Sequence, residues 1–155
     1  MRFDIDKILR EIETLPAWET EIGLQGVEGN MDPFLSKGTA ENGRYEEGEY
    51  KNHEYTKPIF DIPYVNSIMQ DLDLCRTRLM ILKPKTCYYW HADQQKRCHI
   101  PLKTNESCFL IIEKKIIHLP ADGHRYVLDT TKEHTALNAG HTDRLHIVGV
   151  TKNDS

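Results

Sequence analysis

The sequence has no long apolar run and no excess of basic residues, and each absence excludes a class of protein. Its 155 residues carry 20 lysines and arginines against 24 aspartates and glutamates, a formal net charge of −4. No overall basic field therefore exists to attract nucleic acid or membranes. The first residues are polar and unlike a secretory signal, and no stretch is apolar enough to span a bilayer. We expect a cytoplasmic protein with neither nucleic-acid nor membrane partners.

The sequence also lacks the regular cysteine spacing of a disulfide framework. Its four cysteines lie within strand-like segments, so we expect reduced thiols: Cys75, Cys87, Cys98 and Cys108. The length suits one domain with one sizeable core, and nothing in the sequence indicates an oligomeric state. We expect residues 1–74 to form a helical and loop part that packs on a β core of residues 75–152.

The first half of the chain predicts two helices. Apolar residues recur at helical spacing over residues 4–15, and Pro16 ends this pattern. A second helix is predicted over residues 61–72, with Pro63 near its start. Residues 22–27 form a candidate short strand between them.

Residues 30–57 fit neither a helix nor a strand. Glycines interrupt this segment, and three tyrosines (Tyr45, Tyr50 and Tyr55) recur at a spacing that suits neither period. One interpretation is a solvated insertion. The other is a lid that closes on a substrate, because long loops in compact domains are often functional. In that case the tyrosines contribute apolar surface with a hydrogen-bonding tip.

The second half predicts only β-strands. Short segments rich in apolar and β-branched residues alternate with turn sequences, and no helical period intervenes. Such a series favours an antiparallel double-stranded β-helix, a jelly-roll or cupin-like barrel, against which the helices pack. The predicted strands are 76–82, 87–92, 96–102, 107–113, 115–119, 125–128, 134–139 and 144–151.

One predicted strand ends in two metal-binding side chains. His91 and Asp93 are two residues apart, so on a strand they face the same side and offer a nitrogen and an oxygen to one ion. A second His-x-Asp pair, His141 and Asp143, lies in a turn sequence where both residue types are ordinary. A distant histidine would complete a two-histidine, one-carboxylate triad, which leaves coordination positions open and favours Fe(II).

The third ligand has four downstream candidates. His118 precedes a proline turn and His124 lies inside a turn, whereas His134 and His146 belong to predicted strands. Arg144 opens the strand of His146 and shares a face with it. The planar, permanently charged guanidinium of this arginine suits a carboxylate ligand.

Together these motifs resemble the aspartyl/asparaginyl β-hydroxylase family of Fe(II)/2-oxoglutarate-dependent oxygenases. The resemblance covers about residues 76–151, and the motifs occur in family order. The motifs are Lys83-Pro84, Trp90-His91-x-Asp93, Arg97-Cys98-His99-Ile100-Pro101-Leu102, Gly123, His134-x3-Asn138 and Arg144-Leu145-His146-Ile147.

The resemblance implies a metal site. In a double-stranded β-helix, Fe(II) is expected to be held by His91, Asp93 and His134. The animal hydroxylases that gave the family its name have glycine at the position of Asp93, whereas this chain keeps the carboxylate, as bacterial-type members do. Halogenases of this broad class replace the same carboxylate to make room for halide. Asp93 therefore favours hydroxylation.

The resemblance also implies a cosubstrate and a reaction. Arg144 is expected to bind the distal carboxylate of 2-oxoglutarate, and Arg97 and His99 match an Arg-x-His motif that helps to hold it. The turn between the first metal ligands and Arg97 is shorter than in the animal enzymes. The expected reaction uses O2, releases succinate and CO2, and hydroxylates a C–H bond of an amino acid, a peptide side chain or a small metabolite.

Two other classes of protein compete with an oxygenase. A zinc site from Cys87, His91, Cys98 and His99 is chemically competent, but adjacent residues such as Cys98 and His99 point to opposite faces of a strand. A non-catalytic cupin-like binding module is the other alternative. The complete triad, together with Arg144, argues against it.

Overall fold

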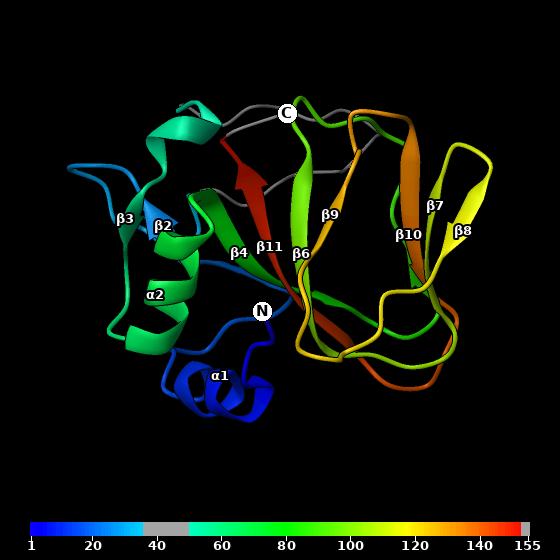
Figure 1. Cartoon of the computed structure of the whole chain (residues 1–155), viewed down its shortest axis with the longest axis horizontal. Coiled ribbons are helices and arrows are strands. Elements are labelled where there is room, and N and C mark those ends of the chain that lie inside the picture. The colour runs from blue at the N-terminus through cyan, green and yellow to red at the C-terminus, as the bar shows by residue number, and fades with distance from the viewer. Residues whose placement is uncertain (36–49, 153–155) are drawn as a thin grey trace.

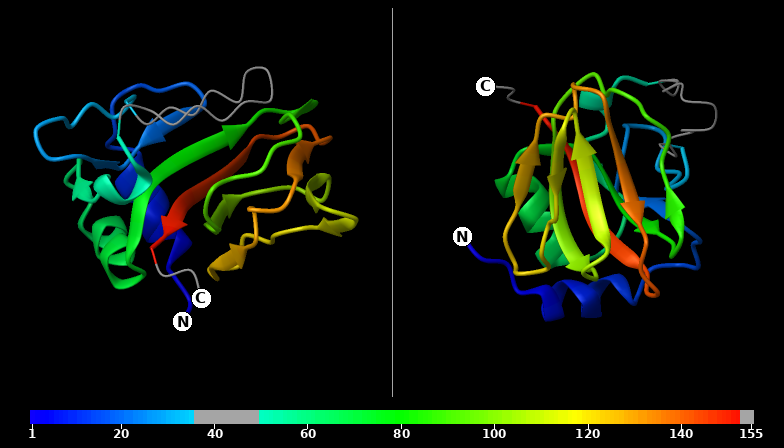
Figure 2. Two further views of the ribbon diagram at one scale, coloured as in Figure 1. Left: turned by 90° about the horizontal axis from the view of Figure 1, so that it is seen from above. Right: turned by 90° about the vertical axis from the view of Figure 1, so that its right-hand side faces the viewer.

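The second half of the chain folds into two facing antiparallel sheets, and the helices of the first half pack outside one of them (Figures 1 and 2). The computed structural model describes residues 1–35 and 50–152. Its elements are α1 (Ile5–Ile12), β1 (Glu21–Gly23), β2 (Gln25–Gly26), η2 (Asn52–Glu54), β3 (Lys57–Pro58), α2 (Pro63–Asp71), β4 (Leu74–Leu82), β5 (Thr86–Cys87), β6 (Arg97–Lys103), β7 (Cys108–Ile112), β8 (Lys115–Ile117), β9 (Tyr126–Leu128), β10 (His134–Asn138) and β11 (Arg144–Thr151).

The order of the strands is that of a double-stranded β-helix. The larger sheet has five strands in the order β1-β4-β11-β6-β9, and the smaller has four in the order β5-β10-β7-β8. Neighbouring strands are mostly non-consecutive in the chain, so the connections cross repeatedly from one sheet to the other. The predicted mainly β, jelly-roll architecture with N-terminal helices is confirmed.

Side chains on the larger sheet alternate between two environments. On its outer face, residues from the sheet and the helices form the main apolar core, which includes Ile8, Ile22, Val65, Leu79, Ile100 and Ile147. Between the sheets lies a smaller apolar cluster of Leu82, Leu110, Leu119 and Ala136. The apolar residues fill only part of the space between the sheets, and the remaining inward positions carry buried polar and charged side chains.

Glu11 of α1 joins the two predicted helices. Its carboxylate accepts hydrogen bonds from the backbone N–H groups of Tyr64 (2.8 Å) and Val65 (2.9 Å) in the first turn of α2. Ile62, the residue that precedes this helix, offers no side-chain cap. A negative charge from α1 thus takes the place of a local N-cap.

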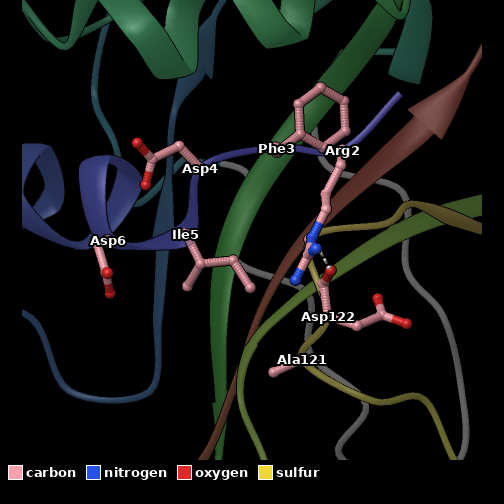
Figure 3. Close-up of a pocket in the computed structure, with 8 residues that line it drawn as sticks. Arg2, Phe3, Asp4, Ile5, Asp6, Ala121 and Asp122 are labelled. Carbon is pink, nitrogen blue, oxygen red and sulfur yellow. Dashed lines mark hydrogen bonds between the residues drawn. The ribbon is translucent and has the colours of Figure 1, made fainter.

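The N-terminal segment is attached to the barrel at a turn around Gly123. The backbone N–H of Phe3 donates to the carbonyl of Gly123 (2.7 Å), and Arg2 Nε donates to the carbonyl of Asp122 (3.1 Å). Figure 3 shows the surface hollow at this junction. Gly123 has a φ of +84°, and a Cβ there would lie 2.6 Å from the Phe3 carbonyl oxygen, so glycine is needed. The hollow contains none of the residues predicted to bind metal or cosubstrate.

The structure corrects two predictions for the first half. The single strand predicted over residues 22–27 is two strands, of which β1 pairs with β4 and extends the larger sheet. Of the segment predicted to be irregular, residues 30–57, the structure describes residues 30–35 and 50–57, which contain the short helix η2 and the first residue of β3. Tyr55 is only 1% exposed, so it packs inside the protein, and the lid stays a prediction. Tyr45 lies outside the described residues.

Two further expectations concern membranes and cysteines. Within the described parts of the chain, no helix combines the length and apolarity that a transmembrane span requires. All four cysteines are free thiols, and only Cys87 is exposed.

Candidate metal centre

His91 and His134 are held opposite each other by a pair of backbone hydrogen bonds. The N–H of His91 donates to the carbonyl of His134 (3.0 Å), and the N–H of His134 donates to the carbonyl of His91 (2.8 Å). The centroids of their imidazole rings lie 4.3 Å apart. The backbone pairing therefore sets the separation of the two imidazoles.

A β-bulge directly precedes His91. Tyr88 donates its N–H to the carbonyl of Ala136, and three residues later His91 pairs with His134, only two residues from Ala136. The first strand thus carries one extra residue, which is the defining feature of a bulge. The continuous strand predicted over residues 87–92 is therefore wrong: β5 ends at Cys87.

The bulge changes which side chains face the interior. Tyr88 packs against the apolar cluster that contains Ala136, and His134 shares that face of β10. The extra residue also turns His91 inward, although a regular strand would have placed Tyr88 and His91 on opposite faces. The two residues between them remain outside, with Tyr89 60% and Trp90 51% exposed.

The Asp93 carboxylate lies between the two histidines. Its Oδ1 is 3.8 Å from His91 Nε2, and its Oδ2 is 3.6 Å from His134 Nε2. The backbone N–H of Asp93 donates to the carbonyl of Thr130 (2.8 Å), which fixes the loop. Arg97 Nε lies 3.4 Å from Asp93 Oδ2, and both side chains are buried. Burial lowers the pKa of Arg97 to about 10, and the nearby carboxylate opposes this shift.

The free ring nitrogens of both histidines point toward this carboxylate. His91 Nδ1 lies 2.7 Å from the carbonyl oxygen of Tyr89, and His134 Nδ1 lies 2.8 Å from that of Lys132. A carbonyl oxygen only accepts, so each Nδ1 carries the hydrogen and donates it. In the neutral form of either ring the lone pair is then on Nε2, the arrangement in which an outer partner orients a metal-ligating histidine.

The three side chains fit one metal ion. Their ligand atoms lie within 4.8 Å of one another, and no other such group of three occurs in the described residues. Ligands bound at about 2 Å from one ion lie within about 4 Å of each other, so a small side-chain adjustment allows shared coordination. Two histidines and one carboxylate suit Fe(II) and leave positions open. The alternative zinc site is not formed, because neither Cys87 nor Cys98 joins this group.

Arg144 is a buried cation inside the same barrel. It is 3% exposed, and its Nε has no hydrogen-bond partner. No carboxylate in the described parts of the chain forms an ion pair with it. Burial lowers the pKa of Arg144, whereas Tyr88 and Cys108 nearby raise it. Although β10 and β11 belong to opposite sheets and are not adjacent, Arg144 and His134 both face the interior.

Sequence comparison identifies the family. Residues 40–150 match the family model of the aspartyl/asparaginyl β-hydroxylases, which is more than half of the chain. The protein belongs to this family. No curated protein matches the sequence of this family member.

Solved structures similar to this β-hydroxylase family member include two proteins described as cupin domains. A cupin domain from Bordetella pertussis Tohama I is 16% identical, with a TM-score of 0.44 over 50% of this chain and 81% of that one. A predicted oxalate decarboxylase from Thermotoga maritima is 16% identical, with a TM-score of 0.42 over 55% and 71% of the two chains. A cupin-2 domain-containing protein from Shewanella frigidimarina NCIMB 400 is 15% identical, with a TM-score of 0.40 over 50% and 70%.

The interior of this β-hydroxylase family member contains two buried polar pairs, of which the first lies outside the motifs and the second joins two of them. Arg78 of β4 forms a buried ion pair with Glu21 of β1, with Nη1 and Oε1 2.7 Å apart. His146 of β11 lies beside His99 of β6, and their Nδ1 atoms are 3.1 Å apart. The alternation of side chains along β4 indicates that Arg78 points into the barrel. Its partner Glu21 comes from a distant segment, so the ion pair becomes evident only from the pairing of β1 with β4.

Proposed function

We propose that the protein is an Fe(II)/2-oxoglutarate-dependent dioxygenase that hydroxylates an unactivated C–H bond and releases succinate and CO2. The observation that carries this proposal is the placement of two complementary features in one barrel. One is the triad of His91, Asp93 and His134, and the other is the buried, uncompensated charge of Arg144. Membership of a β-hydroxylase family supports the same reaction class.

The three side chains would occupy three coordination positions of the metal and leave the others open to ligands from solution. His91 and His134 present lone pairs on Nε2 because their Nδ1 hydrogens are donated to backbone carbonyls. Asp93 adds a negative charge that favours a divalent cation. When bound, Fe(II) supplies the activation of O2 and the oxidation of the C–H bond, and the protein supplies binding and orientation.

Arg144 binds the distal carboxylate of 2-oxoglutarate in this proposal. An unpaired guanidinium in a buried site is costly, and an anionic ligand that makes charge-assisted hydrogen bonds removes that cost. His99 lies on the same inner surface and contributes a further polar contact. Arg97 keeps the Asp93 carboxylate in place beside the metal, and its cationic side chain adds to the field that attracts dianionic 2-oxoglutarate.

The substrate is an amino acid, a peptide side chain or another small metabolite. The exposed aromatic side chains of Tyr89 and Trp90 directly precede the metal ligand His91. They lie on the outside of the bulge, so the apolar surface that they offer can contact only a substrate that extends beyond the interior of the barrel.

Binding and turnover are tested in sequence. Under anaerobic conditions, calorimetry should detect binding of Fe(II), followed by metal-dependent binding of 2-oxoglutarate. Oxygen is then admitted, and succinate release is measured across a panel of amino acids and short peptides. A compound that stimulates succinate release and gains one oxygen atom by mass spectrometry supports the proposal.

Variants of the two His-x-Asp pairs provide matched controls. Asp93→Ala should weaken metal binding more than about 100-fold, because even changes in residues outside the ligand set cost 10–100-fold. Asp143→Ala alters the turn pair and should bind metal as the wild type does. Metal binding with no 2-oxoglutarate binding would refute the dioxygenase and indicate a non-catalytic cupin-like module.

A further inference from the structure

His99 and His146 form a buried pair inside the barrel. They come from the neighbouring strands β6 and β11, and their Nδ1 atoms lie 3.1 Å apart. Their rings meet edge to face at 86°. His146 is 1% exposed, so it has almost no access to solvent. Neither histidine belongs to the metal triad, and the proposed reaction does not account for the direct contact between them.

The contact requires the two rings to be different tautomers. A hydrogen bond between two Nδ1 atoms contains one hydrogen, so one ring is protonated on Nδ1 and the other on Nε2. Both rings are neutral. Burial lowers the pKa of His99 to about 3 and the pKa of His146 well below its ordinary value, and the positive charge of Arg144 is the second largest cause of both shifts. Two arrangements of the hydrogen atoms remain.

The surroundings of His146 decide between these arrangements. Its Nε2 is sealed from solvent and has no hydrogen-bond partner. If that nitrogen carried the hydrogen, a buried N–H donor would have no acceptor, and orphaned buried donors are rarer than orphaned acceptors. The hydrogen of His146 therefore belongs on Nδ1, from which it is donated to His99. His99 must then carry its own hydrogen on Nε2.

We propose that His146 is a positioning residue that holds His99 as an Nε2–H donor toward a carboxylate of the ligand in the barrel. The identity of the ligand rests on the proposed function, but the tautomer does not. Val148 of β11 is paired with His99, and Arg144 lies on the same inner face of β11. An uncharged N–H and a guanidinium thus line one inner surface. The opposite tautomer would present a lone pair that repels an anion.

Nuclear magnetic resonance tests the tautomer directly. Long-range 1H–15N spectra of the full-length, zinc-loaded protein labelled at its histidine rings distinguish a protonated ring nitrogen from an unprotonated one. Variants at His99 and His146 assign the signals. We expect hydrogen on Nδ1 of His146 and on Nε2 of His99. Hydrogen on Nδ1 of His99 would overturn the proposal, whether or not 2-oxoglutarate binds.

Affinity measurements test the consequence for the ligand. The probe is 2-oxoglutarate, titrated calorimetrically into zinc-loaded protein so that no turnover occurs. His146→Leu removes the donor and should weaken binding about tenfold, the lower range for loss of an orienting partner. His146→Asn keeps an N–H at the position of Nδ1 and should bind close to the wild type. His118→Leu removes an imidazole that contacts the Cys108 carbonyl instead, and it should leave affinity unchanged.

The outcomes separate the two proposals. Unchanged affinity in folded His146→Leu, or equally weak binding in His146→Leu and His146→Asn, would overturn the positioning role. Failure of the wild type to bind 2-oxoglutarate would overturn the proposed function, while the ring spectra still report the tautomer. If His146→Leu does not fold, His146→Asn and the wild-type spectra decide the matter.

Discussion

The Nε of Arg97 lies 3.4 Å from Oδ2 of Asp93, and the same oxygen lies 3.6 Å from Nε2 of His134. One carboxylate oxygen therefore faces a buried cation and a metal-binding imidazole at once. In the metal-free protein, Arg97 supplies the countercharge for Asp93. A bound divalent cation supplies a second one, so the importance of Arg97 for stability depends on the metal.

Replacing Arg97 should destabilise the metal-free protein more than the metal-loaded protein. Arg97→Met leaves the buried carboxylate without its cation, which should lower the free energy of unfolding by about 3 kcal/mol. Zinc should recover part of this loss. Urea unfolding with and without zinc measures both values. As a control, Lys83→Met breaks the exposed pair with Asp143 and should cost less than about 1 kcal/mol. Equal losses with and without metal would contradict the prediction.

Replacing Arg144 should weaken cosubstrate binding without destabilising the unliganded protein. Arg144→Met removes the partner of the distal carboxylate, so 2-oxoglutarate affinity should fall by about 2 kcal/mol, roughly 30-fold. The wild-type charge has no internal partner, so its removal should leave thermal stability equal or higher. Calorimetry and thermal unfolding check the two effects, with exposed Arg125→Met as the control. Wild-type affinity in Arg144→Met would refute the assignment.

Mild acid should destabilise the metal-free protein through His99 and His146. Burial lowers both pKa values in the folded state, so below the ordinary pKa of 6.5 the unfolded chain binds more protons than the folded protein. The free energy of unfolding then falls as the pH drops from about 7 toward 5, and each histidine contributes a slope approaching about 1.4 kcal/mol per pH unit. Urea unfolding across this range measures the slope.

A double variant separates these two histidines from other titrating groups. His99→Asn combined with His146→Asn removes both ring nitrogens that gain a proton on unfolding. Its stability should depend less on pH between 7 and 5 than that of the wild type. An equal slope in the two proteins would show that other groups cause the acid sensitivity.

The hydroxyl of Thr135 should stabilise the bulge before the metal ligands. Thr135 Oγ1 donates to the carbonyl of Tyr88 at 2.5 Å, across the position where the strands lose register. Thr135→Val removes this bond and should cost about 1 kcal/mol of stability. Because the bulge directs His91 inward, zinc affinity should fall as well. Denaturation and zinc titration measure the two effects, and a stability loss with unchanged zinc affinity would separate the bulge from the metal site.

The chemistry of the metal ligands and the β character of the second half could be predicted from the amino-acid sequence alone. His91, Asp93 and His134 are recognisable because their atoms suit one kind of ion and because the motifs occur in a characteristic order. The strand positions follow from residue types and turn sequences, which act over a few neighbouring residues. Such local properties can be predicted without knowing which strands become neighbours in the sheet.

The contacts between groups that are distant in the sequence could not be predicted in this way, because they depend on how the elements pack. Glu11 reaches the start of α2 and Glu21 pairs with Arg78, because α1 and β1 pack against the second half of the chain. The bulge before His91 depends on the strand opposite it, so periodicity along one strand predicts a continuous segment instead. The contact between His99 and His146 likewise arises from the register of β6 against β11, which backbone pairing and side-chain packing determine together.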